Sequence, residues 1–106
     1  MKADLLPAKH PLAIITVPFD FGPLLVECAN PATAEVVSAT VTATLFSGTD
    51  PTPSAILALA PDLSQAPTVL QRIVGGVDGA SYLLTGLATT NSGEVIVLEG
   101  LLPVSS

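Results

Sequence analysis

The side chains that could carry out chemistry are few and scattered. The chain of 106 residues has one histidine, His10, one cysteine, Cys28, and nine acidic residues. A Ser-His-Asp arrangement would have to use His10, which lies in a proline-bracketed segment, and no nucleophile-elbow motif accompanies it. The acids are dispersed, without the spacing of a calcium loop. We therefore expect no enzymatic activity, no metal, no cofactor and no small-molecule substrate.

Three further features that could be taken for chemical sites have structural interpretations. The Gly-Gly-Val-Asp-Gly segment at 75–79 is not a phosphate loop, because no lysine follows it and no helix starts there. Cys28 has no second cysteine to pair with and no basic neighbour in sequence, so we interpret it as a small buried hydrophobe. Asp50 and Asp78 stand beside turn residues, where an aspartate commonly caps its own backbone.

The composition limits the partners that the protein can have. Its net charge is −6, and Lys2, Lys9 and Arg72 are its only cations besides the histidine, so nucleic acid and anionic membranes are not expected ligands. No apolar run approaches the length of a spanning helix, and prolines and charges interrupt the N-terminus where a signal peptide would be apolar. We expect a protein that is made and kept without secretion. Only 11% of its residues are charged, which leaves few charges to cover the surface and favours a protein that functions packed against other proteins.

Alternating sequence patterns predict β-strands rather than helices. In residues 35–50, apolar side chains from Val37 to Leu45 alternate with serine and threonine, as in a half-buried strand. Residues 13–17 are a β-branched strand that Pro18 is expected to end. Residues 68–76 form another strand, whereas 54–61 fits either a helical turn or a short strand. No stretch of ten or more residues has a convincing helical stripe.

The C-terminal third predicts a β-hairpin. Its strands are residues 82–89 and 94–101, and Asn91, Ser92 and Gly93 supply the turn between them. On the first strand Tyr82, Leu84, Gly86 and Ala88 share one face, which we expect to be core. The other face, with Leu83, Thr85, Leu87 and Thr89, is expected to be a half-wet surface.

Together these elements predict one all-β domain over residues 1–106. Six or seven strands at this spacing are typical of a single sandwich, with residues 1–13 as an extended arm or edge segment and no disulfide. The spacing Asp78-x-Ala80-x-Tyr82-x-Leu84 resembles the entry to strand F of immunoglobulin-type domains, with Leu84 at the usual cysteine position. The resemblance implies an Ig-like or fibronectin-III-like sandwich of about seven antiparallel strands. It also implies that Tyr82 is a corner tyrosine, with its hydroxyl bonded to backbone just upstream; the alternative is a merely half-buried strand residue.

A wider resemblance covers most of the chain. The Phe-Asp-Phe stretch at 19–21, the Ser-Ala-Thr-Val strand at 38–41 and the Gly-Gly, Tyr and Thr-Thr-x-x-Gly landmarks of 75–93 are similar to small virion proteins of tailed phages, the fibre-to-tail adaptors. Phe21 and Leu25 stand where that family more often has tryptophan. The resemblance implies a structural virion protein that attaches tail fibres. Its partners would be tail, neck, portal or fibre proteins and copies of itself in a ring, after synthesis in the bacterial cytoplasm.

The segment after Pro18 is the predicted interface. It combines two aromatics and two leucines in an irregular stretch: Phe19, Asp20, Phe21, Leu24 and Leu25. Both rings should face one way and Asp20 the other, toward solvent or a partner's cation. Two alternatives stay open. The first is that this corner packs into the core of its own sandwich. The second is that the protein is a head decoration or a receptor- or glycan-binding Ig-like module. A glycan site would want an exposed tryptophan or tyrosine, and the chain has no tryptophan.

Overall fold

The computed structural model describes residues 4–26, 28 and 32–106, so Lys2 and the first three residues of the expected arm lie outside the described chain. Within that part, seven strands and two short helical segments follow one another. The strands are β1 (Asp4–Leu5), β2 (Ile15–Asp20), β3 (Val36–Ser47), β4 (Leu57–Asp62), β5 (Thr68–Ile73), β6 (Ser81–Thr90) and β7 (Val95–Pro103). The helical segments are α1 (Gly22–Leu25) and the 3-10 helix η1 (Pro53–Ile56).

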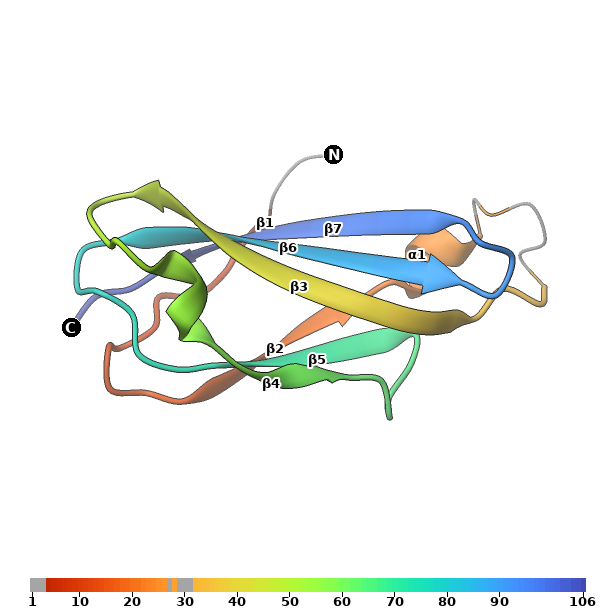
Figure 1. The fold of residues 1–106 in the computed structure, drawn as a ribbon, viewed down its shortest axis with the longest axis horizontal. Helices are drawn as coiled ribbons and strands as arrows, with labels where there is room; N and C mark the ends of the chain where they lie inside the picture. The colour runs from red at the N-terminus through yellow and green to blue at the C-terminus, as the bar shows by residue number, and fades with distance from the viewer. Residues whose placement is uncertain (1–3, 27, 29–31) are drawn as a thin grey trace.

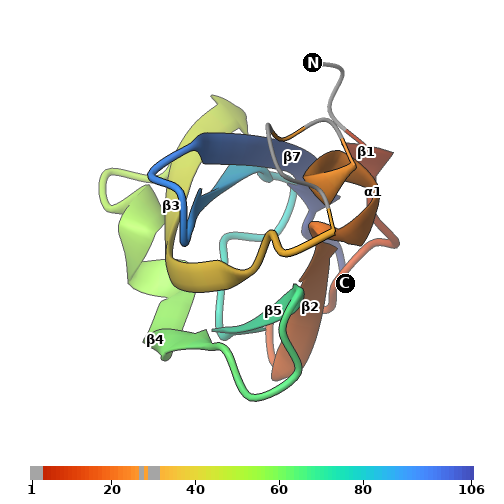
Figure 2. The ribbon, with the colours of Figure 1, turned by 90° about the vertical axis from the view of Figure 1, so that its right-hand side faces the viewer.

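The strands form two sheets that pack face to face (Figures 1 and 2). One sheet has the order β1-β7-β6-β3 and the other the order β2-β5-β4. Neighbours are antiparallel except for β1, which runs parallel to β7. The molecule is elongated, with extents of 44 × 25 × 21 Å. The predicted all-β sandwich is confirmed at this level.

The start of the chain is an edge segment of the larger sheet. After β1, the Leu6 N–H donates to the Leu101 carbonyl and the Lys9 N–H donates to the Pro103 carbonyl, both at 2.9 Å. Lys9 also forms an isolated parallel bridge with Val104. The described part of the expected arm therefore lies along β7 as far as Lys9.

Two strand predictions need correction. Pro18 does not end its strand, because β2 continues to Asp20 and Pro18 pairs with Leu70 of β5. A proline is tolerated there because β2 is an edge strand, so its missing N–H faces away from the ladder. In β3, Val37 is 53% exposed instead of half buried. The register shifts between Val36 and Ser38, so Val36 takes the inward place.

The other segments follow the sequence pattern closely. The ambiguous stretch 54–61 contains both structures, because the end of η1 leads directly into β4. The hairpin of β6 and β7 turns at residues 91–93, where Gly93 has a φ of +86°. The Thr90 N–H donates to the Glu94 carbonyl at 2.8 Å and closes the hairpin.

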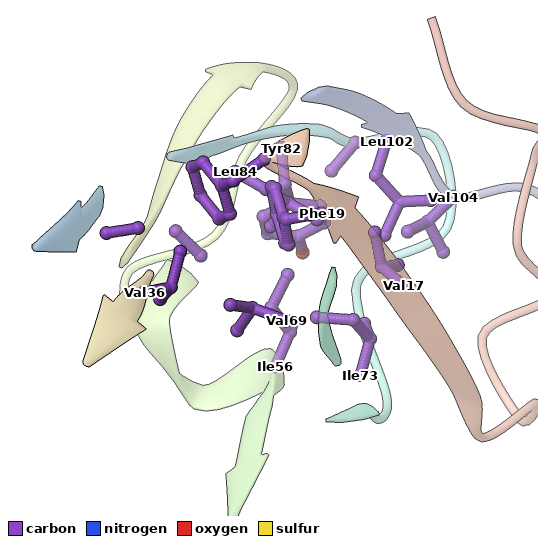
Figure 3. Packing of buried hydrophobic residues seen from close by; sticks show 14 residues of the cluster. Val17, Phe19, Val36, Ile56, Val69, Ile73, Tyr82, Leu84, Leu102 and Val104 are labelled. Atoms are coloured by element: carbon purple, nitrogen blue, oxygen red, sulfur yellow. The ribbon is translucent and has the colours of Figure 1, made fainter. Parts of the chain in front are cut away.

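The core lies between the sheets and includes the large side chains of Phe19 on β2, Ile73 on β5 and Tyr82 on β6 (Figure 3). The predicted inward face of β6 is confirmed, since Tyr82, Leu84 and Ala88 are fully buried. Gly86 leaves room on this face for the ring of Phe19. A Cβ at Gly86 would lie only 2.9 Å from Phe19 Cδ1, so the two sheets approach closely at this point.

Candidate interaction surface

The two rings of the predicted interface lie in the core. Phe19 is 4% exposed and Phe21 is fully buried, and their ring centroids are 6.5 Å apart. Both rings face the same side, as predicted, but that side is the interior of the sandwich. Strand β2 continues past Pro18, so Phe19 lies on its inward face. The expectation that these rings are exposed anchors for a partner is wrong, and the alternative that the corner plugs its own sandwich is correct for both.

Of the other three residues of the corner, Asp20 is accessible, whereas Leu24 and Leu25 pack partly against the core. Asp20 is exposed, as predicted, and its Oδ1 accepts a hydrogen bond from the Gly22 N–H at 2.9 Å. Leu24 and Leu25 are half buried on α1. Asp20 and Leu24 line a surface hollow of about 370 Å³ beside Glu99 of β7. Contact of these three residues with a partner stays a prediction.

The burial and the upstream backbone bond that were expected of Tyr82 are both observed. Its ring is fully buried, and its hydroxyl accepts a hydrogen bond from the Val77 N–H at 2.9 Å, five residues upstream. The hydroxyl also donates to Asp50 Oδ2 at 2.7 Å, a bond that the sequence did not indicate. Burial, and then the Asp50 bond, raise the pKa of Tyr82. Leu84, at the position of the usual cysteine, is a fully buried core residue.

The two aspartates at turns behave differently from each other. Asp50 caps its own backbone as predicted, since its Oδ1 accepts the Thr52 N–H at 2.9 Å. The Tyr82 hydroxyl and this backbone bond lower the pKa of Asp50. Asp78 instead holds the end of the chain, because the Ser106 N–H and hydroxyl donate to its two oxygens at 3.0 and 2.9 Å.

Exposure differs among the side chains that could carry out chemistry. His10 is exposed, and its Nδ1 accepts the Leu12 N–H at 3.0 Å. Cys28 is buried. Lys9 is buried too, with Nζ donating to the Gly75 and His10 carbonyls at 2.7 and 2.9 Å, and desolvation lowers the pKa of this ammonium group. No group of three or more histidine, cysteine or acidic side chains in the described chain could hold a metal ion.

The outward side of the larger sheet is the most distinctive surface. We call it the Glu99 face. Its cross-strand rows are Thr40, Leu87 and Val97; Thr42, Thr85 and Glu99; and Thr44, Leu83, Leu101 and Leu5, with Thr89 and Val95 at one end. None of its aliphatic side chains belongs to the core or packs against it. Leu5 is 75% exposed and Val95 is 55% exposed.

Among the residues of these rows, Glu99 is the only charged one. Around it the rows carry only leucine, valine and threonine, which is an unusual surface for a monomeric domain. The sequence predicted a half-wet surface from Leu83 and Leu87 but missed its extent, because Val95, Val97 and Leu101 join it only through the pairing of β6 with β7. This uncovered apolar sheet, rather than the corner at Phe19, is the candidate interface.

Comparisons with protein-family models, curated proteins and solved structures find no match to this chain. Among the described residues, no helix is long and apolar enough to cross a membrane.

Proposed function

We propose that this protein is a structural virion protein of a tailed phage, an adaptor that joins tail or neck proteins to fibres. The Glu99 face is the observation that carries the assembly role. An uncovered sheet side with one charge suits burial against another protein, since few charges have to be desolvated there. The phage setting rests on the sequence landmarks that resemble fibre-to-tail adaptors.

We further infer that the sandwich is Ig-like. In that class one sheet holds strands C, F and G, and the other holds A, B, E and D. The sheets β3-β6-β7 and β2-β5-β4 correspond to C-F-G and B-E-D in order. The Tyr82 hydroxyl bond to upstream backbone, near the start of the strand that corresponds to F, supports the same assignment.

Protein analysis of purified particles tests the virion role. The particles must come from the phage whose genome encodes the chain, and they should contain the protein in several copies. Particles that carry fibres but lack this protein would refute the adaptor assignment.

A matched pair of variants tests the surface. Val97→Lys places a second charge on the Glu99 face, whereas Val77→Lys makes the same change at a 42% exposed loop residue outside it. We expect folded Val97→Lys protein to be lost from particles and Val77→Lys protein to be incorporated normally. Equal incorporation of both variants would move the interface to another surface.

A further inference from the structure

The outward side of the smaller sheet complements the Glu99 face. We call it the Arg72 face. Arg72 lies at its centre on β5, opposite Thr16 of β2 and Ala58 of β4, and the next row holds Leu70 between Pro18 and Asp62. The structure describes two lysine or arginine residues, of which Lys9 is buried and Arg72 is exposed. Arg72 is therefore the exposed cation of the described chain.

Leu59 is held on this face in an unfavourable conformation. Its φ is +65°, a left-handed value that is unfavourable for a leucine, and its side chain is 76% exposed. The buried Gln71 fixes this irregular stretch of β4, because its Nε2 donates to the Ala58 and Leu59 carbonyls at 3.1 and 3.2 Å. A strained backbone that presents an apolar side chain to solvent is a feature that often serves a function.

A surface hollow lies directly beside these residues. It has a volume of about 210 Å³ and is lined by Thr16, Leu59, Ala60, Asp62, Leu70 and Arg72. Leucine and threonine methyl groups give it apolar walls, and its two charged lining residues are Arg72 and Asp62. Such a site can receive an aliphatic side chain and pair a carboxylate next to it.

The Glu99 face presents that combination. Glu99 stands between rows that contain Leu87 and Val97 on one side and Leu83 and Leu101 on the other. A contact between two Glu99 faces would bury two carboxylates with no cation in the rows of either face, and on the Arg72 face the guanidinium shares its hollow with the Asp62 carboxylate. Only contact between the two different faces places Glu99 opposite Arg72.

We propose that copies of this chain stack front to back, with the Glu99 face of one copy on the Arg72 face of the next. Glu99 pairs with Arg72, and a neighbouring leucine or valine enters the hollow beside Leu59. Such a contact is heterologous, so repeated copies close into a ring or continue as a filament. The proposal rests on the proposed function only in taking the Glu99 face as an interface.

Charge reversal in purified protein tests this contact. Sedimentation velocity should show that the wild type associates as its concentration rises. Glu99→Arg alone and Arg72→Glu alone should each raise the dissociation constant of self-association by about tenfold or more, because each opposes like charges. An equimolar mixture of the two variants should associate again, since each face of one variant then meets the opposite charge on the other. The chain with both substitutions should associate like the wild type.

A third variant controls for net charge and fold. Glu35→Arg changes the charge as Glu99→Arg does, at an exposed residue outside both faces, and should leave association unchanged. Urea unfolding verifies that every variant is folded. A wild type that stays monomeric at its highest soluble concentration, single variants that associate normally, or a mixture that stays monomeric would each overturn the front-to-back contact. A monomeric protein that is nevertheless found in particles would overturn this contact alone and leave the virion role standing.

Discussion

The contact between Gly86 and the Phe19 ring predicts an unusual response to a single methyl group. Alanine in the middle of a strand is normally more stable than glycine by about 0.5–1 kcal/mol. At position 86, however, the new Cβ would lie 2.9, 3.2 and 3.3 Å from three atoms of the Phe19 ring. That ring is 4% exposed and stacks on Phe21, so it cannot move aside without disturbing the core.

The two effects oppose each other, and their sizes decide the sign. Forcing an extra methyl group into a packed core costs about 1–3 kcal/mol, which exceeds the intrinsic gain from alanine. We therefore expect Gly86→Ala to lower the free energy of unfolding by about 1 kcal/mol.

Gly100 provides the matched control on the neighbouring strand. A Cβ there would approach Leu6 Cδ1 at 3.1 Å, and this atom is the far end of a flexible, half-buried side chain on the edge segment. Gly100→Ala should consequently be neutral or stabilising by up to about 1 kcal/mol.

Urea unfolding measures both variants, with an unchanged m value showing that only stability has altered. Phe19→Leu adds a second check, because a smaller side chain should relieve the clash. The double variant Gly86→Ala with Phe19→Leu should then be more stable than the sum of the single effects implies. A Gly86→Ala protein at least as stable as the wild type would refute the close packing of the two sheets at this point.

Three further predictions concern the core and its polar corner. Tyr82→Phe should lower the free energy of unfolding by about 1–2 kcal/mol, because the hydroxyl makes two hydrogen bonds; an unchanged urea midpoint would reject the corner role. Asp50 has a lower pKa in the folded protein than the unfolded value of 3.8, so its ionised carboxylate stabilises the fold at pH values above 3.8. This contribution is lost as the pH falls through the folded-state pKa. Asp50→Asn should therefore flatten the acid side of a plot of urea midpoint against pH, and an identical slope in both proteins would contradict that. Phe19→Ser should lower the free energy of unfolding by about 3–5 kcal/mol, on the scale of Phe→Ala, so its urea midpoint should fall well below that of the wild type, and an unchanged midpoint would contradict the burial.

The sequence could predict the strands whose side-chain alternation is strict. On β6 the pattern from Tyr82 to Ala88 predicted both the strand and its buried face, and the Asp-x-Ala-x-Tyr spacing predicted the bond of the Tyr82 hydroxyl to upstream backbone. These features are local, because a strand's faces follow directly from the period of two.

The remaining features depend on pairing between distant segments. Pro18 could continue a strand only because β2 lies at a sheet edge, which nothing near Pro18 in the sequence reveals. The inward direction of Phe19 and Phe21 follows from that continuation. The extent of the Glu99 face likewise required the register that sets Leu87 beside Val97.

The parallel pairing of the chain's two ends has a mechanical consequence. Strands β1 and β7 run in the same direction, and Leu6 and Lys9 continue their ladder toward Pro103 and Ser105. A tensile load that pulls the two ends apart would slide these segments along each other, so their hydrogen bonds share the force and must break together. Antiparallel terminal strands would instead peel open one bond at a time. A domain that joins two bodies through its ends would resist rupture in this geometry.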